Sequence, residues 1–342
     1  MPSHLLPADA VALRAARDAA VACDLTPLAV LAIAGPDAAA FLNGQLSSDV
    51  TSLAEGGCQY TSCNSPKGRM LANFVLWKDG DAEFRALLPA DLAGPITRRL
   101  SMYVLRSKLT LADVSAATAR FGIGGPAAAD ALRAAFGAAP APFAVTRTGG
   151  ITVLGLPGPR FVVTAPAAAA LSTREALLRQ AIVAPFPVWQ WLTIRSGVPV
   201  VTAPTQDQFV AQMANWDVLG GVNFQKGCYT GQEVIARTHY LGRLKERLFA
   251  FHAEAATILA GARLYSVAFG DQACGTVINA APAPEGGCDL LAVVQLAAAE
   301  SGDVHLDAPA GLDERRVILV VFLDPHLHEE LRRRVLGHRQ DL

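Results

Sequence analysis

The first third of the chain alternates short apolar runs with turn-forming residues. Pro36 stands where the first turn of a helix tolerates proline, and Asp91 stands where an N-cap is expected. Two runs of alternating polarity flank the segment "NSPKG", which predicts a hairpin turn. The expected order is a strand over 31–35, a helix over 37–46, strands over 59–63, 69–77 and 82–88, and a helix over 92–105.

A second unit of similar size begins near Arg120. Ser172 and Glu175 have the spacing of a capping box, and Gly137 is typical of a helix end. Two successive units of this kind predict paired βαβ-type α+β lobes that face each other. The expected elements are a strand ending at 121–125, a helix over 126–137, a hairpin of 151–156 and 160–165, a helix over 173–181 and a strand over 188–197.

From about Leu241 the pattern changes to short strand-like runs separated by glycine, proline and charged turns. This rhythm is typical of a small all-β barrel or sandwich. The runs lie at 246–253, 262–268, 273–281, 290–297 and 315–323. The last residues predict a surface helix or a frayed end. We therefore expect an α+β protein with lobes over 1–115 and 116–240, a β-barrel over 241–330 and a tail over 331–342.

Composition agrees with a globular protein of two or three domains, because 342 residues exceed what one core usually holds and 52% of them are hydrophobic. The 29 basic and 30 acidic residues leave a formal net charge of −1, so no broad surface for a nucleic-acid backbone is expected. No basic and apolar leader opens the chain, and no uncharged apolar run reaches about 18 residues. We expect a soluble, cytoplasmic protein with no membrane partner and no direct nucleic-acid binding.

Several chemical signals in the chain are weak. Cys58 and Cys63 have a spacing that matches no common zinc knuckle, so no metal site is expected. The segment "GIGGPA" fits a loose dinucleotide-loop pattern, but no acidic residue for a ribose follows about 20 positions later. His239 lies a whole short helix away from Cys228, which argues against a cysteine-hydrolase pair.

The strongest candidate site is the polar stretch "KGCYTGQE", which runs from Lys226 to Glu233. Thr230 and Glu233 have the spacing of a capping box, so Thr230 is the expected N-cap of a short helix. The N–H groups of a helix start and the cation of Lys226 both favour the thiolate of Cys228. A cysteine that only packs at a helix start is the alternative, and this stretch alone leaves both interpretations open.

The stretch "KGCYTGQE" resembles the signature of the YgfZ-type folate-binding proteins, which are relatives of an iron–sulfur assembly factor in the glycine-cleavage T-protein superfamily. Nearly the whole chain is similar to that family, in the same order. The matching stretches are "FLNGQLSSDV" (41–50), "YTSCNSPKGRMLANFVLW" (60–77), "WLTIRSGVPV" (191–200), "LGGVNFQKGCYTGQEVIART" (219–238), "GTVINAA" (275–281) and "LAVVQL" (291–296).

The resemblance implies three domains in a ring around a central hole that binds tetrahydrofolate. It also implies a role in building or repairing the iron–sulfur clusters of client enzymes, including those that thiolate tRNA. Client enzymes or assembly proteins would then be partners. Cys228 is the residue whose thiol the family requires, with Lys226 as a second candidate catalytic residue. The residues that match the motif are Lys226, Gly227, Cys228, Tyr229, Thr230, Gly231, Gln232 and Glu233.

The chain departs from the T-protein pattern at the positions that carry its acid–base chemistry. Ala72 and Asn73 stand where acidic residues are expected, and neither can ionise. Arg195 replaces a folate-orienting glutamate, and the T-protein counterpart of Cys228 is an aspartate. A classical aminomethyltransferase is therefore disfavoured. A folate-dependent one-carbon transferase is the rival hypothesis, and a folate sensor without thiol chemistry is a third.

Asn73, Trp189 and Arg195 are the candidate folate contacts. Trp189 and Trp191 share one face of the predicted strand, where they either fill the core or form a wall for a flat pterin ring. Asn73 and Arg195 are candidate polar contacts to the pterin or to the glutamate tail. Our leading hypothesis is a tetrahydrofolate-binding accessory protein for iron–sulfur cluster assembly or repair that acts through Cys228.

Overall fold

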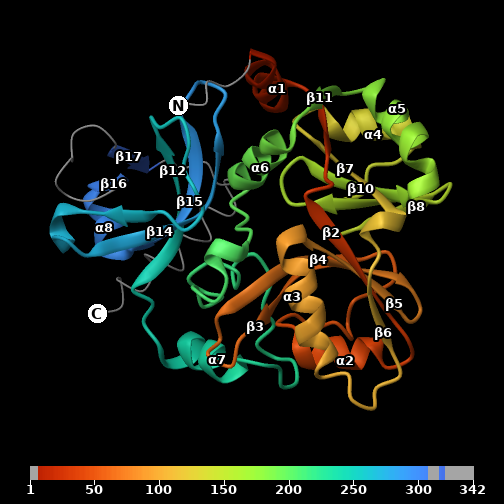
Figure 1. The fold of residues 1–342 in the computed structure, drawn as a ribbon, viewed down its shortest axis with the longest axis horizontal. Helices are drawn as coiled ribbons and strands as arrows, with labels where there is room; N and C mark the ends of the chain where they lie inside the picture. The colour runs from red at the N-terminus through yellow and green to blue at the C-terminus, as the bar shows by residue number, and fades with distance from the viewer. Residues whose placement is uncertain (1–6, 307–315, 320–342) are drawn as a thin grey trace.

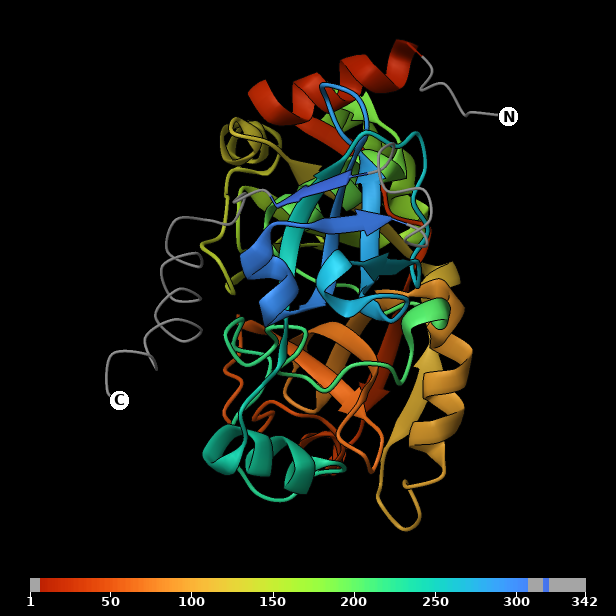
Figure 2. The same cartoon turned by 90° about the vertical axis from the view of Figure 1, so that its left-hand side faces the viewer.

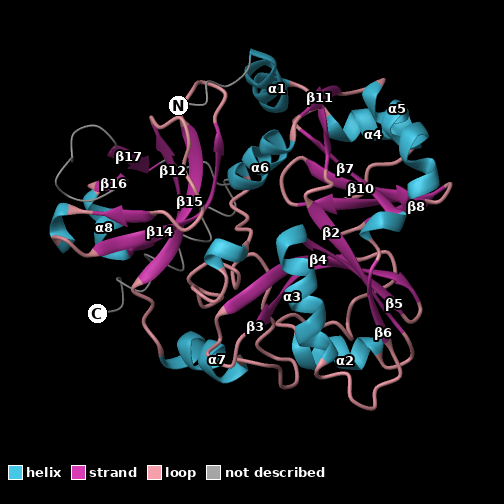
Figure 3. Ribbon diagram, viewed as in Figure 1, coloured by secondary structure: helices cyan, strands magenta, loops and turns pink. Residues whose placement is uncertain are grey.

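The computed structural model describes residues 7–306 and 316–319, which form two open sheets, a closed barrel and the helices around them (Figure 1). The two open sheets lie on the right of Figure 1 and the barrel on the left. Helix α6 (Phe186–Arg195) contacts both the barrel and the six-stranded sheet. Long loops cross the middle of the molecule below this helix (Figure 3).

The five-stranded sheet is antiparallel and has the order β3-β4-β5-β2-β6. The predicted hairpin around "NSPKG" is confirmed as β3 and β4, with Ser62 opposite Asn73. Its elements are β2 (Leu28–Ala34), α2 (Ala38–Gln45), β3 (Cys58–Asn64), β4 (Met70–Gly80), β5 (Glu83–Pro89), α3 (Ala90–Ser101) and β6 (Thr110–Asp113).

The six-stranded sheet has the order β11-β1-β7-β10-β9-β8, and only the β1–β11 pair is parallel among these strands. Strand β1 pairs with β7, so a segment near the N-terminus belongs to this sheet although the next strand belongs to the other one. The predicted lobe boundary at 115/116 stays a prediction. The elements are α1 (Pro7–Asp18), β1 (Val21–Asp24), β7 (Thr118–Gly124), α4 (Ala128–Phe136), β8 (Val145–Thr148), β9 (Ile151–Leu156), β10 (Arg160–Pro166), α5 (Ala170–Leu178) and β11 (Ile182–Ala184).

The predicted C-terminal barrel is confirmed as a closed barrel in the order β12-β15-β14-β13-β16-β17. Its elements are β12 (Glu246–Ala253), β13 (Arg263–Tyr265), β14 (Ala273–Pro282), β15 (Cys288–Gln295), α8 (Leu296–Ser301), β16 (Val304–Leu306) and β17 (Arg316–Leu319). The predicted helix or frayed end of the tail lies outside the described residues.

Three predicted helix caps are wrong by a few residues. Helix α3 has Pro89 as its N-cap and Asp91 inside its first turn, because the helix starts directly where β5 ends. Helix α5 begins at Ala170, before the predicted cap at Ser172. Helix α7 (Gln232–Leu241) has Gly231 rather than Thr230 as its N-cap, and Gly231 adopts a φ of +83° that favours glycine.

The strand predicted over 188–197 is wrong, because residues 188–195 belong to helix α6. Aromatic and β-branched side chains suggested a strand, but burial on several sides of a helix overrides such propensities. Val188, Trp189, Trp191 and Leu192 are all buried. Pro185 at the N-cap and Pro187 in the first turn were the available signals for a helix start.

Seen from the barrel side, α1 lies at the top of the molecule and α7 at the bottom (Figure 2). The motif "KGCYTGQE" therefore lies at the end of the molecule opposite to α1. No described helix combines the length and the apolar composition needed to cross a membrane.

Candidate functional site

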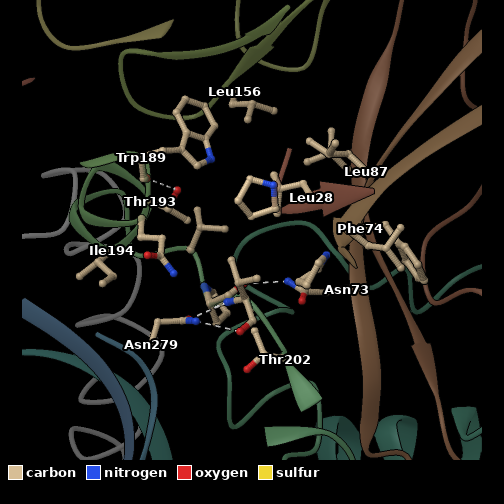
Figure 4. A pocket seen from close by; sticks show the side chains of 18 of the residues that line it. Leu28, Asn73, Phe74, Leu87, Leu156, Trp189, Thr193, Ile194, Thr202 and Asn279 are labelled. Atoms are coloured by element: carbon tan, nitrogen blue, oxygen red, sulfur yellow. Dashed lines mark hydrogen bonds between the residues drawn. The ribbon is translucent and has the colours of Figure 1, made fainter. Parts of the chain in front are cut away.

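A largely apolar cavity of about 220 Å³ lies where α6, the five-stranded sheet and the barrel strand β14 approach one another. Figure 4 shows Trp189 and Leu156 on one side of this central cavity and Leu28 and Leu87 facing them. Tyr60 and Trp216 also line it, with ring centroids 5.2 Å apart. Flat apolar walls of this kind fit a planar ring.

Trp189 reaches the cavity because strand β7 carries glycines beneath α6. A Cβ atom on Gly122 would lie 2.4 Å from Cε3 of Trp189, and one on Gly124 would lie 2.5 Å from Cδ1 of Leu192. The two glycines share one face of the strand by its period of two. The segment "GIGGPA" is thus explained by close packing of a helix on a sheet.

Arg160 is a buried cation in the wall of the central cavity, with 2% of its surface exposed. Its guanidinium donates to the carbonyl oxygen of Pro157, to Oγ1 of Thr193 at 3.0 Å and to the hydroxyl of Tyr60 at 3.3 Å. It also lies 5.7 Å from the ring of Trp189. No carboxylate among the described residues pairs with it. A buried cation with neutral partners favours an electron-rich or anionic ligand beside it.

Asn73 lines the central cavity, but its amide is held by backbone groups. Its Nδ2 donates to Pro199 O at 2.7 Å, and its Oδ1 accepts from Val201 N at 2.8 Å. Asn279 of the barrel holds Val200, the residue between them, in the same way. Its Nδ2 donates to Val200 O at 2.8 Å, and its Oδ1 accepts from Val200 N at 2.7 Å. The two asparagines therefore clamp residues 199–201 between the five-stranded sheet and the barrel.

Arg195 does not line the central cavity in the described chain. Its guanidinium lies 5.7 Å from the ring of Trp191, whose Nε1 donates to Asp289 at 2.8 Å. Burial lowers the pKa of Arg195, and the charge of Asp289 acts in the opposite direction. The structure thus brings together Trp189 and Asn73, whereas Arg195 belongs to the contact between α6 and the barrel.

Lys226 secures the motif to the loop that follows α2. Its ammonium donates three hydrogen bonds, to the carbonyl oxygens of Asn43 at 2.6 Å, Leu46 at 2.8 Å and Ser48 at 2.7 Å. All three N–H groups of the ammonium are used. Burial lowers the pKa of Lys226 to about 8, and the charge of Asp49 works against that shift. These bonds hold Lys226 against the chain that precedes and follows the end of α2, and its predicted catalytic role stays a prediction.

Cys228 is exposed, whereas the other five cysteines are buried. Burial raises the pKa of the Cys23 and Cys58 thiols to about 12 and that of Cys63 to about 11. Burial also raises the pKa of Cys274 to about 11. The expected exposure of Cys228 is therefore confirmed, and its thiol differs from the rest in access to solvent.

The motif lies against the β3–β4 hairpin, which also reaches the central cavity. A Cβ atom on Gly231 would lie 2.4 Å from Ser65 O, and one on Gly68 would lie 3.0 Å from Cβ of Val234. Asn73, which lies near the start of β4, lines the central cavity. None of the eight motif residues lines that cavity. One hairpin thus contacts both the motif and the cavity.

Arg160 and Asn279 were not predicted from the sequence. Arg160 follows the turn "PGP", a position where a charged residue normally faces solvent, so no local signal revealed its burial. Asn279 was visible as an isolated amide within the apolar run 273–281, which is unusual for a strand.

Comparison with known proteins gives consistent results. The family model described as "GCVT N-terminal domain" matches residues 6–158. The chain is 33% identical over 268 residues to "tRNA-modifying protein YgfZ" of Serratia proteamaculans, which covers 75% of this chain and 79% of that protein. It is 34% identical to the protein of that name from Cronobacter sakazakii over 65% and 68% of the two chains. The Escherichia coli K12 protein of that name is 30% identical over 75% and 80%.

Among solved structures, the glycine cleavage system aminomethyltransferase T from Bartonella henselae matches with a TM-score of 0.75 and 17% identity, over 93% of this chain and 88% of that one. Identity this low shows a shared fold and nothing more. The sequence similarity to the named relatives extends over most of each chain, and on that ground the protein belongs to the YgfZ family.

Proposed function

We propose that this protein binds tetrahydrofolate and supports the assembly or repair of iron–sulfur clusters in client enzymes, including enzymes that thiolate tRNA. The name of its relatives, "tRNA-modifying protein YgfZ", supports a role in tRNA modification. The exposure of Cys228 within its motif, with every other cysteine buried, is the observation that carries the proposal. Cys228 would act as the thiolate that holds a sulfur or iron-bearing intermediate or exchanges with a partner's thiol.

The central cavity is the proposed site for the pterin ring of the folate. Its apolar walls suit a flat bicyclic ring, and Trp189 supplies a stacking surface. Arg160 would offer its guanidinium to an electron-rich ring oxygen. The cavity of about 220 Å³ is smaller than typical pockets for a whole ligand, about 300–1,000 Å³, so the glutamate tail would extend outside it. The folate contacts of Asn73 and Arg195 stay predictions.

We also propose the three-part, ring-like arrangement that the family resemblance implies, with lobes over 1–115 and 116–240 and a barrel over 241–330. The clamp of residues 199–201 by Asn73 and Asn279 supports close association of the barrel with the five-stranded sheet. In this arrangement the folate would lie near the centre.

A one-carbon transferase receives little support from the site. Ala72 is fully buried and cannot transfer a proton. The amide of Asn73 is already bonded to backbone groups on both of its polar atoms. A folate-binding protein that acts on clusters through a thiol requires neither residue to ionise.

The proposal is tested by replacing Cys228 with alanine in a strain that lacks the protein. Cys228→Ala should fold normally and fail to restore the level of thiolated tRNA, because the variant lacks the reactive thiol. Cys274→Ala serves as the matched control, since Cys274 is buried in the barrel. Full rescue by Cys228→Ala would overturn the thiol role.

Folate binding is tested separately by titration calorimetry with tetrahydrofolate. Replacing Arg160 with methionine should weaken binding about tenfold or more, the size expected for one hydrogen bond to a charged group. Cys228→Ala should leave this affinity unchanged. Unaltered affinity in the Arg160 variant would remove the central cavity as the folate site while leaving the thiol proposal intact.

A further inference from the structure

A second pocket of about 390 Å³ lies beside the motif and differs in character from the central cavity. This volume falls within the range of about 300–1,000 Å³ that is typical of small-ligand sites. Polar and aromatic side chains predominate in its lining. The lining residues come from the loop after α2, from β3, from the segment before the motif and from the end of α7: Ser48, Asp49, Ser52, Gln59, Gly220, Val222, Asn223, Phe224, Gln225, His239 and Tyr240.

The walls of this motif-side pocket are held together by buried hydrogen bonds. The hydroxyl of Ser47, which is fully buried, donates to Gly221 O at 2.5 Å, and Ser47 O accepts from Asn223 N at 2.9 Å. Lys226 donates to the carbonyl oxygen of Ser48. Two segments about 170 residues apart in sequence are thereby fixed to each other. A pocket held in this way needs little ordering before a ligand binds.

One wall of the pocket is aromatic. The ring of Phe224 stacks on His239, with centroids 3.8 Å apart and planes 16° apart. Tyr240 meets His239 edge-on, with centroids 4.8 Å apart, and 65% of its surface is exposed. Exposed aromatic side chains of this kind offer contact surface to a planar ligand ring.

The charge of the lining favours a ligand that donates hydrogen bonds. Asp49 is the acidic residue in the wall, and hydrogen bonds from Thr51 and Ser52 hold the pKa of its carboxyl below its usual value. Oδ1 of Asp49 accepts the bonds from Thr51, at 3.0 Å and 2.7 Å. No lysine or arginine lines this pocket among the described residues, and the ammonium of Lys226 is directed at backbone carbonyls. Phosphate groups are therefore disfavoured, whereas N–H groups are favoured.

We propose that the motif-side pocket binds a nucleobase that carries an N–H or NH₂ donor, with any attached phosphates outside the pocket. Asp49 accepts the donor edge, and the aromatic wall of Phe224, His239 and Tyr240 contacts the ring. The site is distinct from the central cavity, since the two share no lining residue. The nucleobase proposal requires neither folate binding nor the reactivity of Cys228, so it can be tested independently of the proposed function.

The test is a two-dimensional NMR titration of the full chain with guanosine. Saturable shifts are expected for the backbone amides of 223–225 and 239–240. Asp49→Asn should raise the dissociation constant about tenfold, the effect of losing one charge-assisted hydrogen bond. Asp130→Asn is the matched control, because its carboxylate is exposed on α4, and it should leave the constant unchanged.

Two further arms sharpen the test. Guanosine 5′-monophosphate should bind more weakly than guanosine, and Asp49→Asn should narrow that difference because the repelling carboxylate is gone. Tyr240→Ala, a change at an exposed residue, should also weaken guanosine binding. Absence of saturable shifts, or equal affinity in the wild type and both pocket variants, would overturn the proposal. Shifts of the same amides by tetrahydrofolate that are lost in Asp49→Asn would overturn it too, by assigning the pocket to folate.

Discussion

The central cavity and the motif-side pocket are built from different parts of the chain. The walls of the central cavity come mainly from strands and helix α6, and apolar side chains such as Phe74 and Ile194 predominate. The motif-side pocket is formed mostly by loops and by the end of α7, with polar side chains such as Gln59 and Asn223. The first should bind through burial of a flat apolar surface, and the second through directed hydrogen bonds.

This difference predicts that the two regions respond differently to mutation. Side chains at the central cavity are part of the packed core, so changes there should alter stability and binding together. Gly227 and Cys228 of the motif are exposed, so changes at these two residues should alter function with little loss of stability. Stability measurements on matched substitutions can therefore confirm or contradict the comparison.

The largest expected effect is that of Gly122→Ala. The added Cβ would lie 2.4 Å from the ring of Trp189, which is itself buried, so the free energy of unfolding should fall by about 3 kcal/mol. Gly227→Ala is the matched change in the motif, where no atom beyond the two chain neighbours lies within 4 Å of the added Cβ. This change should lower the free energy of unfolding by less than about 0.5 kcal/mol. Urea denaturation measures both. Equal effects of the two substitutions would contradict the comparison.

A smaller loss is expected for Asn73→Ala. The change leaves Pro199 O and Val201 N without their partner, so the free energy of unfolding should fall by about 2 kcal/mol. Asn279→Ala should have a similar effect, because it frees both backbone groups of Val200. The two losses should not add in the double variant, since both asparagines hold one segment. Strict additivity in thermal or chemical denaturation would show that the clamp does not act as a unit.

Lys226→Met should lower the free energy of unfolding by about 1 kcal/mol, because three carbonyl groups lose a donor at a partly exposed site. The pKa of Lys226 is about 8 in the folded chain and 10.5 for an ordinary lysine. The unfolded chain therefore binds more protons between these pH values, and the wild type should gain stability relative to the variant as the pH rises through them. Denaturation of both proteins below and above pH 8 measures this. If the wild type instead loses stability relative to the variant over this pH interval, the three carbonyl groups raise the pKa of Lys226 above its ordinary value.

The smallest effect on stability is expected at the motif cysteine. Cys228→Ser should change the free energy of unfolding by less than about 0.5 kcal/mol, because the side chain is exposed. Alkylation of the native protein near neutral pH, followed by mass spectrometry, should label Cys228 and leave Cys23 and Cys58 unmodified, since burial raises the pKa of both to about 12. Rapid labelling of a buried cysteine would contradict the closed core of the structure.

Local patterns were sufficient for the elements whose neighbours in sequence are also neighbours in space. The β3–β4 hairpin and the barrel followed from alternation and turn residues, because consecutive antiparallel strands are joined by short turns. Helix α6 was missed since its apolar side chains contact several elements at once, and such burial hides the helical period. The start of α3 was misplaced because the chain enters that helix directly from β5, and the start of α5 because a short 3₁₀ helix over Ala167–Ala169 precedes it.

The same distinction applies to the candidate site, in which local features were predicted from the sequence and long-range contacts were not. The motif and the exposure of Cys228 were expected from the sequence, and a place in the cavity wall was one of the two interpretations left open for Trp189. Arg160 could not be recognised, because only its packing under α6 makes a turn-flanking arginine a buried cation. Lys226 was expected to activate the thiol, whereas its ammonium is bound to three carbonyl groups.

The amino-acid sequence by itself determined the family, the barrel, the first hairpin and the one motif with a solvent-accessible thiol, since each depends on residues close together in the chain. Only the tertiary structure decided which side chains meet in the two pockets and which polar groups are already occupied by backbone partners. These properties depend on contacts between residues more than a hundred positions apart, such as Asn73 with Pro199 and Lys226 with Ser48, and no local pattern specifies them.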